Sequence, residues 1–340
     1  MKALDFPNNI QIETTSRCNA TCGFCPYPEV STTQPQGAMD QDLFERLIDE
    51  ISWHRVQLLQ PFLNNDPLMD PQIVPRLELM IRKNPRTRIC VTTNGSLLRP
   101  PIARALAAMP LETIHISSNG LTPSVYRATM GLDAWPILHN VNVLWDEIRR
   151  RGSKTRLVVT AILMKQNQRE VERMRDYWRA RGVEFFLNPL NDRAGNITTE
   201  KYVQLLPFSN DLAQSQFQET RMTSCASIYS FLGILWNGDT VTCCQDWRRT
   251  HMMGNLRNTT IYALWHGLQY QRMRSYSDQG RLDELPLCSD CGSQRFSVDA
   301  GALRDMLARQ KGNPDDWASL EFLESLKGDD SVVKQNLVRT

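Results

Sequence analysis

The sequence predicts an α/β fold built around a parallel sheet. Short runs of β-branched and apolar residues alternate along the first part of the chain with segments whose apolar residues recur every three or four positions. Turn-forming residues separate the two kinds of segment. Strands that alternate regularly with helices form a parallel sheet, because each helix returns the chain to the edge where the next strand begins.

Six strands are expected in this first part of the chain. They are Asn9 to Thr14, Val56 to Gln60, Arg88 to Thr92, Thr113 to Ser117, Arg156 to Leu163 and Val183 to Leu187. Helices with one apolar face are expected at about Asp40 to Ser52, Pro71 to Lys83, Pro101 to Ala108, Ala134 to Arg151 and Gln168 to Arg181. The handedness and closure of the sheet do not follow from this pattern.

Composition narrows the class of protein. At 340 residues, the chain is long enough for one large domain and a smaller one. Its net charge of +2 gives no reason to expect a nucleic-acid or membrane surface. No apolar run approaches the roughly 20 residues that a transmembrane helix needs, and the start lacks the apolar core of a secretory signal. We therefore expect a cytoplasmic protein.

Nine cysteines in a reducing compartment favour metal binding over a disulfide framework. Cys18, Cys22 and Cys25 stand in the run Arg-Cys-Asn-Ala-Thr-Cys-Gly-Phe-Cys-Pro, directly after the first expected strand. Three thiolates can face one metal centre but cannot complete the four-cysteine shell of an ordinary iron-sulfur cluster, so one iron stays open. The alternatives are core thiols and a zinc site, although zinc prefers four ligands in paired spacings and no histidine or fourth cysteine is near.

This triad resembles the signature of the radical S-adenosylmethionine (radical SAM) superfamily, C-x3-C-x2-C with an aromatic residue, here Phe24, before the third cysteine. The resemblance implies a site-differentiated 4Fe-4S cluster whose open iron is chelated by S-adenosyl-L-methionine, with reductive cleavage to a 5'-deoxyadenosyl radical. It implies a partial (β/α)6 TIM-like barrel over roughly residues 8 to 200. An external one-electron donor of the flavodoxin or ferredoxin type is implied as a partner. Active-site groups of such folds lie at the carboxyl ends of strands.

Motifs after the later strands resemble the elements that bind S-adenosyl-L-methionine in this superfamily. Asn65 and Asp66 align with the Gly-Glu-Pro element that holds the methionine amino group, with Asn where Gly is usual and Asp where Glu is usual. An ordinary turn before Pro67 is the alternative. The other implied residues are Thr93 and Asn94 in a Thr-Asn-Gly turn, Ser117 and Asn119 in a Ser-x-Asn-Gly element, and Arg127, expected to contact the methionine carboxylate. The alternative for Arg127 is a solvated arginine on a helix.

A second cysteine set lies in the last third of the chain. The segment from Cys225 to Cys243 is typical of a β-hairpin that turns at Trp236-Asn237-Gly238-Asp239. With Cys288 and Cys291, the arrangement resembles the SPASM or shorter twitch extension of radical SAM enzymes. This implies a small β-hairpin plus helix domain with one auxiliary 4Fe-4S cluster on Cys225, Cys243, Cys288 and Cys291. A structural zinc on the same thiolates is the alternative.

Cys244 is left over beside a cluster ligand. Neighbouring residues of a strand point to opposite faces, so if Cys243 faces the cluster, Cys244 faces away from it. A free thiol at the barrel mouth could give a hydrogen atom to a substrate radical, as a cysteine does in radical SAM epimerases; a packed thiol is the alternative. Cys90, inside the third strand, is expected in the core.

Residues 188 to 196 form a polar linker after the sixth strand, in a position to meet substrate. Asp192 or Arg193 could bind or deprotonate a hydroxyl there, and a plain linker is the alternative. The run from Gln245 to Arg248, after the cysteine pair, is a second candidate surface for substrate binding. We expect the barrel over residues 1–200, the auxiliary domain over 201–311, and a helix and frayed tail over 312–340.

Taken together, the cysteine triad and the second cysteine set resemble those of radical SAM enzymes that act on aminocyclitols, aminoglycosides or other sugars in antibiotic biosynthesis. The implied reaction is hydrogen abstraction from a carbon of a small sugar, aminocyclitol or sugar nucleoside, followed by dehydrogenation, by epimerisation through Cys244, or by decarboxylation. The alternative is a peptide-modifying maturase, placed second because no leader-binding domain fits before Asn9. A nonenzymatic metal protein is disfavoured by the strand-end motifs.

Overall fold

The structure is a computed structural model that describes residues 3–188, 190–207, 217–218, 223–291 and 295–296. Six parallel strands form its larger part, in the order β1-β2-β3-β4-β5-β6. They are β1 (Asn9–Ile12), β2 (Leu58–Gln60), β3 (Arg88–Thr93), β4 (Thr113–Ser117), β5 (Arg156–Ile162) and β6 (Glu184–Asn188). The predicted α/β fold is confirmed, and the six strands are the six expected from the sequence.

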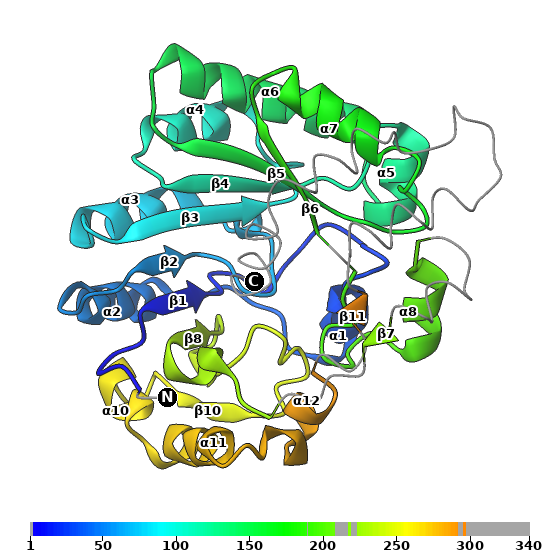
Figure 1. Ribbon diagram of the computed structural model, residues 1–340. Helices are drawn as coiled ribbons and strands as arrows, with labels where there is room; N and C mark the ends of the chain where they lie inside the picture. The colour runs from blue at the N-terminus through cyan, green and yellow to red at the C-terminus, as the bar shows by residue number, and fades with distance from the viewer. Residues whose placement is uncertain (1–2, 189, 208–216, 219–222, 292–294, 297–340) are drawn as a thin grey trace.

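Helices cover the outer side of this curved sheet (Figure 1). They are α2 (Gln41–Ser52), α3 (Ile73–Lys83), α4 (Pro100–Ala108), α6 (Ala134–Arg150) and α7 (Val171–Arg179), each within a few residues of its expected range. In α2, Asp40 caps the first turn by accepting a hydrogen bond of 2.8 Å from the Leu43 N–H. Its apolar stripe, which includes Phe44 and Ile48, is fully buried. Burial of such stripes against the sheet is what holds the helices in place.

Two helices close to the cysteine triad were not expected. They are α1 (Tyr27–Thr33), which begins directly after Pro26, and α5 (Pro123–Met130), which ends at Gly131 in the left-handed conformation. Short elements between and after the barrel strands are the 3-10 helix η1 (Pro67–Met69) and α8 (Thr199–Leu205).

The second part of the chain adds strands to the same sheet. The predicted hairpin is present as β8 (Phe231–Ile234) and β9 (Asp239–Val241), and β10 (Met252–Asn255) pairs with β9. Strand β8 lies parallel to β1, with Ile10 opposite Leu232, so the sheet has nine strands in the order β10-β9-β8-β1-β2-β3-β4-β5-β6. The hairpin therefore extends the barrel sheet beside its first strand.

Helices complete this second part, and they share one core with the barrel. They are η2 (Ala226–Tyr229), α10 (Ile261–Trp265), α11 (Leu268–Asp278), η3 (Leu282–Glu284) and α12 (Pro286–Ser289); a separate pair joins β7 (Phe217–Gln218) to β11 (Arg295–Phe296). Buried side chains from β1, β8 and α10 belong to a single apolar cluster. The expected helix and tail over 312–340 lie outside the described residues.

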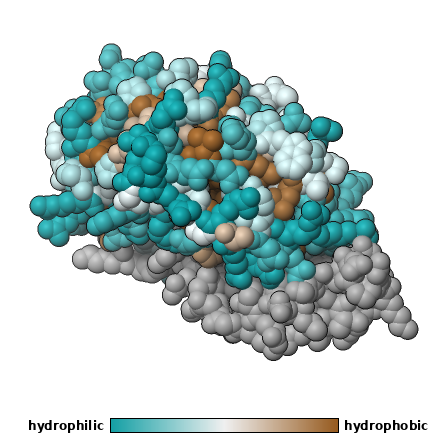
Figure 2. Space-filling view, turned by 90° about the horizontal axis from the view of Figure 1, so that it is seen from above, coloured by the Kyte–Doolittle hydropathy of each residue, from teal (hydrophilic) through white to brown (hydrophobic). Residues whose placement is uncertain are grey.

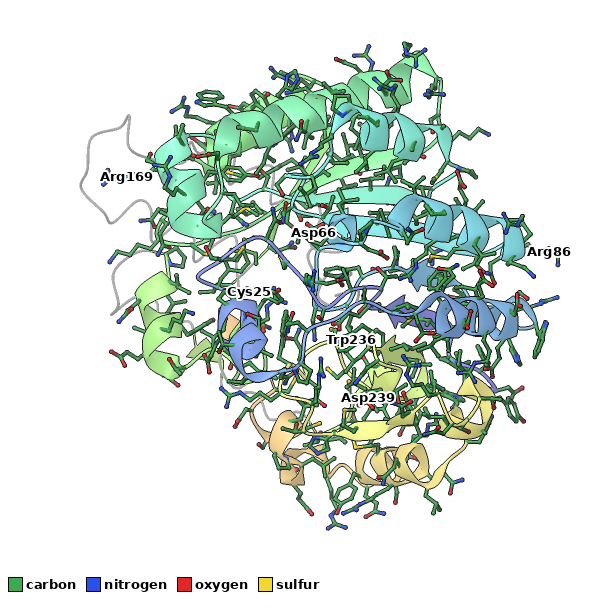
Figure 3. All side chains as sticks on the ribbon, turned by 180° about the vertical axis from the view of Figure 1, so that it is seen from behind. Cys25, Asp66, Arg86, Arg169, Trp236 and Asp239 are labelled. Carbon is green, nitrogen blue, oxygen red and sulfur yellow. The ribbon has the colours of Figure 1, made fainter. Side chains whose placement is uncertain are left out.

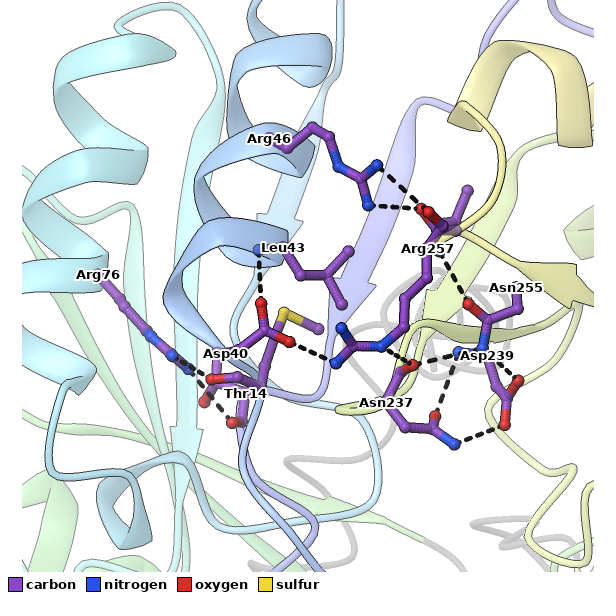
Figure 4. A network of polar contacts seen from close by, with 11 residues as sticks. Thr14, Asp40, Leu43, Arg46, Arg76, Asn237, Asp239, Asn255 and Arg257 are labelled. Carbon is purple, nitrogen blue, oxygen red and sulfur yellow. Dashed lines mark hydrogen bonds and ion pairs between the residues drawn. The ribbon is translucent and has the colours of Figure 1, made fainter.

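A polar network fixes the hairpin to helix α2 (Figure 4). Arg257 pairs with the capping carboxylate of Asp40 and donates a hydrogen bond of 3.0 Å to the Asn237 carbonyl. Arg46 reaches the Leu256 carbonyl at 2.8 Å. The hairpin thus stands at a defined position relative to the barrel.

Among the described residues, no helix is both long and apolar enough to cross a membrane. On the face of the molecule shown in Figure 2, hydrophilic and hydrophobic residues are mixed.

Candidate active site

The segment from Cys18 to Cys25 follows β1 and is held from two sides. On one side, the Cys18 N–H donates a hydrogen bond of 2.7 Å to the Tyr27 hydroxyl at the start of α1. On the other side, the Thr21 N–H donates to the Met130 carbonyl at 3.0 Å. Gly131 follows Met130 with φ 67°, and a Cβ there would collide with the Thr21 side chain. The ends of α1 and α5 therefore shape the cysteine segment.

The three thiols lie within electrostatic reach of one another. Burial and the nearby Asp66 carboxylate raise the pKa of Cys18 to about 12. Burial also raises the pKa of Cys22, and the charges of Cys25 and Cys18 raise it further. Thiolates must form before iron can bind, so the metal charge has to offset both burial and mutual repulsion.

In the described part of the chain, no three histidine, cysteine, aspartate or glutamate side chains are gathered closely enough to form a finished metal shell. The cysteine segment nevertheless fits a cluster by its donor chemistry: three thiols, no competing disulfide, and a backbone fixed at both ends.

Asp66, labelled in Figure 3, ties three of the predicted elements together. Its carboxylate accepts hydrogen bonds from the Thr93 hydroxyl at 2.9 and 3.0 Å and from the Asn94 N–H at 2.8 Å. Its own N–H donates to the Arg17 carbonyl at 3.0 Å, just before the cysteine segment. The ends of β2 and β3 thus meet beside Cys18, whose thiol senses the Asp66 charge. Burial raises the pKa of Asp66.

Asn94 also contacts the cysteine segment. Its amide donates a hydrogen bond of 2.9 Å to the Asn19 side chain, and Asn19 donates one of 2.8 Å to the Ser96 hydroxyl. Asn65, buried next to Asp66, accepts from the Leu63 N–H at 3.1 Å. The predicted Asn65, Asp66, Thr93 and Asn94 are therefore brought together around the first cysteines.

Ser117 ends β4, and Asn119 joins this strand to the next one. The Asn119 side-chain oxygen accepts a hydrogen bond of 2.7 Å from the Ile162 N–H at the end of β5. Its carbonyl accepts one of 3.1 Å from the Asn167 amide. The structure therefore shows Asn119 bridging two strand ends; its predicted contact with the cofactor remains a prediction.

Arg127 lies on the outer side of α5. Its side chain is 68% exposed and forms an ion pair of 3.2 Å with Asp133. The neighbouring Tyr126 is the residue of this pair that points inward: it is fully buried and senses the charge of Cys22. The predicted contact of Arg127 with the methionine carboxylate is untested, and the structure shows the surface ion pair instead.

The loop after β6 carries Arg193 in a conformation that is rare outside glycine. Arg193 and Ala194 have φ values of 59° and 54°, and Gly195 follows with φ 73°. The Asn191 side chain accepts a hydrogen bond of 2.7 Å from the Arg193 N–H, and Asp192 accepts one of 3.2 Å from the Ala194 N–H. These short side chains stabilise the unusual turn. Asp192 itself is buried.

The charge of Arg193 reaches the first cysteine set and Cys244, the neighbour of Cys243 in the second set. Burial raises the pKa values of Cys22 and Cys25, and the Arg193 charge opposes part of that rise. After the hydrogen bond from Cys243, the Arg193 charge also contributes to the lowered pKa of Cys244. The Asn196 amide donates a hydrogen bond of 2.9 Å to the Gln245 carbonyl, which joins the two loops directly. The loop that carries Arg193 is therefore joined to the segment after Cys244, and the proposed role of Arg193 at the substrate remains a prediction.

The second cysteine set is also mutually close. Burial raises the pKa of Cys288 to about 12, and the charges of Cys291 and Cys225 raise it as well. Cys243 senses the charge of Cys291. The four thiols therefore share one electrostatic environment, which fits a fully ligated cluster. Cys225 directly precedes η2, Cys243 follows β9, Cys288 lies in α12 and Cys291 follows α12.

The expected orientation of Cys243 and Cys244 does not apply in the structure. Strand β9 ends at Val241, so the pair lies in the following turn, where side chains need not alternate between faces. The two thiols are hydrogen-bonded to each other, which raises the pKa of Cys243 and lowers that of Cys244 to about 7. Cys90 is buried in β3, as expected.

The Gln245 to Arg248 segment borders the first cysteine region. Gln34, after α1, donates a hydrogen bond of 2.9 Å to the Trp247 carbonyl, and Arg248 pairs with Glu29 of α1 at 3.7 Å. Asp246 is buried, and its carboxylate accepts from the N–H groups of Thr250 and His251 at 2.8 and 2.9 Å. Asp246 therefore shapes the loop.

A pocket of about 780 Å³ lies elsewhere, at the amino ends of β3, β4 and β5. Its lining includes Arg86, Arg88, Glu112 and Lys154, and no cysteine. Active sites of such folds lie at the opposite edge of the strands, so this pocket is not the candidate site.

Sequence reasoning missed two residues of the site, Glu13 and Tyr27. Glu13 directly follows β1, and its position at a strand end was the available signal. Tyr27 follows the third cysteine by two positions, and its contact with Cys18 depends on the path of the cysteine loop.

Two family models match the chain. Residues 12–177 match the model described as the radical SAM superfamily, and residues 225–292 match SPASM, an iron-sulfur cluster-binding domain. These ranges contain all seven predicted cluster cysteines.

Curated relatives and solved structures agree with this arrangement. The chain is 22% identical, over 83% of its length and 86% of the relative, to a tungsten-containing aldehyde ferredoxin oxidoreductase cofactor-modifying protein of Pyrococcus furiosus. It is 20% identical to the S-adenosyl-L-methionine-dependent 2-deoxy-scyllo-inosamine dehydrogenase of Niallia circulans, over 84% of this chain and 92% of the relative.

Two solved structures share the fold. BtrN in complex with AdoMet and 2-DOIA aligns with a TM-score of 0.57 at 17% identity, covering 86% of this chain and 94% of the other. Streptococcus suis SuiB bound to its precursor peptide SuiA aligns with a TM-score of 0.64 at 16% identity, covering 93% of this chain and 75% of the other.

Proposed function

Because this chain belongs to the radical SAM superfamily and carries a SPASM-type iron-sulfur domain, we propose that it is an oxidoreductase or epimerase that abstracts hydrogen from a carbon of a sugar, aminocyclitol or sugar nucleoside. Its cofactors are S-adenosyl-L-methionine and iron-sulfur clusters. When bound, they supply a 5'-deoxyadenosyl radical and an auxiliary electron acceptor.

The residues that would hold these groups are the two cysteine sets. Cys18, Cys22 and Cys25 leave an open coordination position for S-adenosyl-L-methionine, beside Asp66 and Asn94. The set of Cys225, Cys243, Cys288 and Cys291 leaves none, which suits a cluster that only transfers electrons.

One observation supports the proposal most strongly: the Arg193 charge acts on Cys22 of the first set and on Cys244, the neighbour of Cys243 in the second set. A substrate held between the two clusters would meet this guanidinium. A cation there lowers the pKa of a substrate hydroxyl and stabilises the alkoxide that forms as the carbon is oxidised. The 2-deoxy-scyllo-inosamine dehydrogenase among the relatives supports an aminocyclitol or related carbohydrate as substrate.

The test is 5'-deoxyadenosine formation by the anaerobically reconstituted protein, with reductant, against aminocyclitols, aminoglycosides and sugar nucleosides in deuterated water. We expect one class to stimulate formation above the substrate-free rate. Product mass then separates a ketone, a deuterated epimer and a decarboxylated sugar. If no carbohydrate stimulates and a peptide does, the carbohydrate proposal is wrong and the maturase alternative takes its place.

Cys244 decides between the reaction types. If its thiol donates hydrogen, Cys244→Ala should still form 5'-deoxyadenosine with substrate but no deuterated epimer. An unchanged epimer yield would exclude this role, and a ketone from the unmodified protein would assign the enzyme as a dehydrogenase.

The two cluster assignments can be separated by iron content. A Cys18/Cys22/Cys25 triple alanine variant should retain iron and sulfide after anaerobic reconstitution, on the second set. An iron-free triple variant would contradict a second cluster.

A further inference from the structure

Glu13 is a carboxylate held at the mouth of the barrel. It directly follows β1, and its N–H donates a hydrogen bond of 2.7 Å to the Ile234 carbonyl of the neighbouring β8. Its side chain lies near the peptide N–H groups of Trp236, after β8, and Asn64, after β2. Three adjacent parallel strands therefore end around this carboxylate, at the edge that also carries the cysteine triad.

The Glu13 carboxylate is incompletely paired. The residue is 2% exposed, and its Oε1 atom has no hydrogen-bond partner in the described structure. Arg249 is near enough for its charge to act on Glu13, but the described residues form no ion pair with it. Burial accordingly raises the pKa of Glu13 to about 7, against the opposing effects of Arg249 and the two N–H groups. A buried acceptor left unpaired costs free energy in the ligand-free protein.

The other buried glutamates among the described residues are paired. Glu50 accepts hydrogen bonds of 2.9 Å from the Ile261 and Tyr262 N–H groups at the start of α10. Glu170 accepts from the Leu121 N–H at 2.7 Å. Glu13 thus differs from carboxylates that serve the fold, and this difference points to a ligand.

The chemistry around Glu13 selects a ligand group that only donates. Asn64, whose peptide N–H lies near the Glu13 carboxylate, also carries a buried side-chain oxygen, Oδ1, without a hydrogen-bond partner in the described structure. Two unpaired acceptors call for a donor-rich group, and a protonated amine offers three N–H donors, no acceptor, and the opposite charge.

The backbone around Glu13 is fixed before any ligand arrives. The Thr14 carbonyl accepts from the Met39 N–H at 2.9 Å, and the Ser16 N–H donates to the Gly37 carbonyl at 2.9 Å. The Glu13 charge also reaches Tyr27, whose hydroxyl accepts from the Cys18 N–H. A group bound by Glu13 would therefore sit close to the cysteine triad.

We propose that Glu13 binds the protonated amine of the substrate through its unpaired Oε1 atom, which makes aminated cyclitols and sugars the preferred substrates. This inference rests on the proposed carbohydrate function and narrows its substrate class. Glu13 is a binding residue, and no bond of the substrate breaks at it.

The test compares matched substrates on the reconstituted enzyme. One member of each pair is aminated, such as 2-deoxy-scyllo-inosamine or glucosamine; the other carries a hydroxyl in place of the amine. We expect the unmodified enzyme to prefer the aminated member in substrate-stimulated 5'-deoxyadenosine formation. In Glu13→Gln, KM for the aminated member should rise by about 30-fold or more, because removing one partner of a buried charge pair costs at least about 2 kcal/mol. The preference over the hydroxyl member should disappear.

Glu50→Gln is the matched control, since it neutralises another buried glutamate outside the barrel mouth. It should keep the preference for amines, and iron content and circular dichroism confirm that both variants fold.

Three results separate the proposals. Equal stimulation by both members of every pair in the unmodified enzyme would overturn the amine inference and leave the carbohydrate function standing. A preference that survives Glu13→Gln would also overturn the role of Glu13. If no carbohydrate stimulates, the proposed function fails first and the amine inference fails with it.

Discussion

Neutralising Glu13 should stabilise the protein, and only above a defined pH. The pKa of this carboxyl is raised from 4.5 to about 7 by burial. The folded chain therefore binds the proton more tightly than the unfolded chain, so stability falls as pH rises from 4.5 to about 7. A tenfold change in the acid dissociation constant corresponds to about 1.4 kcal/mol. Above pH 7 the charged Glu13 therefore lowers the free energy of unfolding by about 3 kcal/mol.

Glu13→Gln removes this cost because the amide is neutral at every pH. We expect no gain in the free energy of unfolding at pH 4.5 and a gain of about 3 kcal/mol at pH 8, with the rise in between. Urea unfolding followed by far-ultraviolet circular dichroism measures both proteins at each pH. Glu50→Gln, which loses paired hydrogen bonds, should instead destabilise by about 1–3 kcal/mol. A Glu13→Gln variant that is less stable at pH 8 would refute the reasoning, since it would mean that the charged carboxylate is well paired.

Two further predictions address the packing of the cysteine segment and the loop after β6. Gly131→Ala should lower the free energy of unfolding by about 1–3 kcal/mol, because alanine is strained at a φ of 67° and its Cβ would collide with Thr21. Thermal melting and iron content would both report this loss. Values equal to those of the unmodified protein would contradict the contact between Gly131 and Thr21. Gly152→Ala, also at positive φ but with open space around it, is its control and should lose only the conformational part. Arg193→Met should lower kcat/KM for product formation by about 100-fold, whereas Arg193→Lys should recover part of the loss, because the role requires a positive charge; equal loss in both variants would indicate that the fork geometry matters more than charge.

The sequence predicts the strands of the barrel well because each one lies between turn signals and is followed by a helix with a strong apolar stripe. It does not predict α1, whose seven residues include no buried side chain and whose start depends on the contact between Tyr27 and Cys18. Helix α5 carries the sequence signals of both helix ends, Pro123 at its start and Gly131 at its end, but its eight residues form only a short periodic pattern. The pairing of β8 with β1 joins distant parts of the chain, and a local pattern cannot specify its partner.

The sequence motifs predicted which residues lie at the strand ends of the site. They did not predict the hydrogen bonds by which some of these side chains also hold the fold together. Asp66 and Asn119 were expected to bind the cofactor, and both hold neighbouring strand ends together through several hydrogen bonds. Those bonds depend on strand register, which the motifs do not encode. Glu13 shows the reverse case: it carried no motif signal, and its incomplete pairing becomes visible only once three strand ends are placed around it.

The turn after β6 that carries Arg193 has an unusual backbone conformation. Left-handed conformations at Arg193 and Ala194 cost about 1 kcal/mol or more each. The cost is offset by the Asn191 and Asp192 side chains, which accept hydrogen bonds from the N–H groups of the turn, and by the bond that Asn196 donates to the Gln245 carbonyl. The same turn carries the Arg193 guanidinium, whose charge acts on Cys22 of the first set and on Cys244 beside the second. The proposed role of Arg193 at the substrate would account for a turn with this cost, because that role requires a fixed guanidinium.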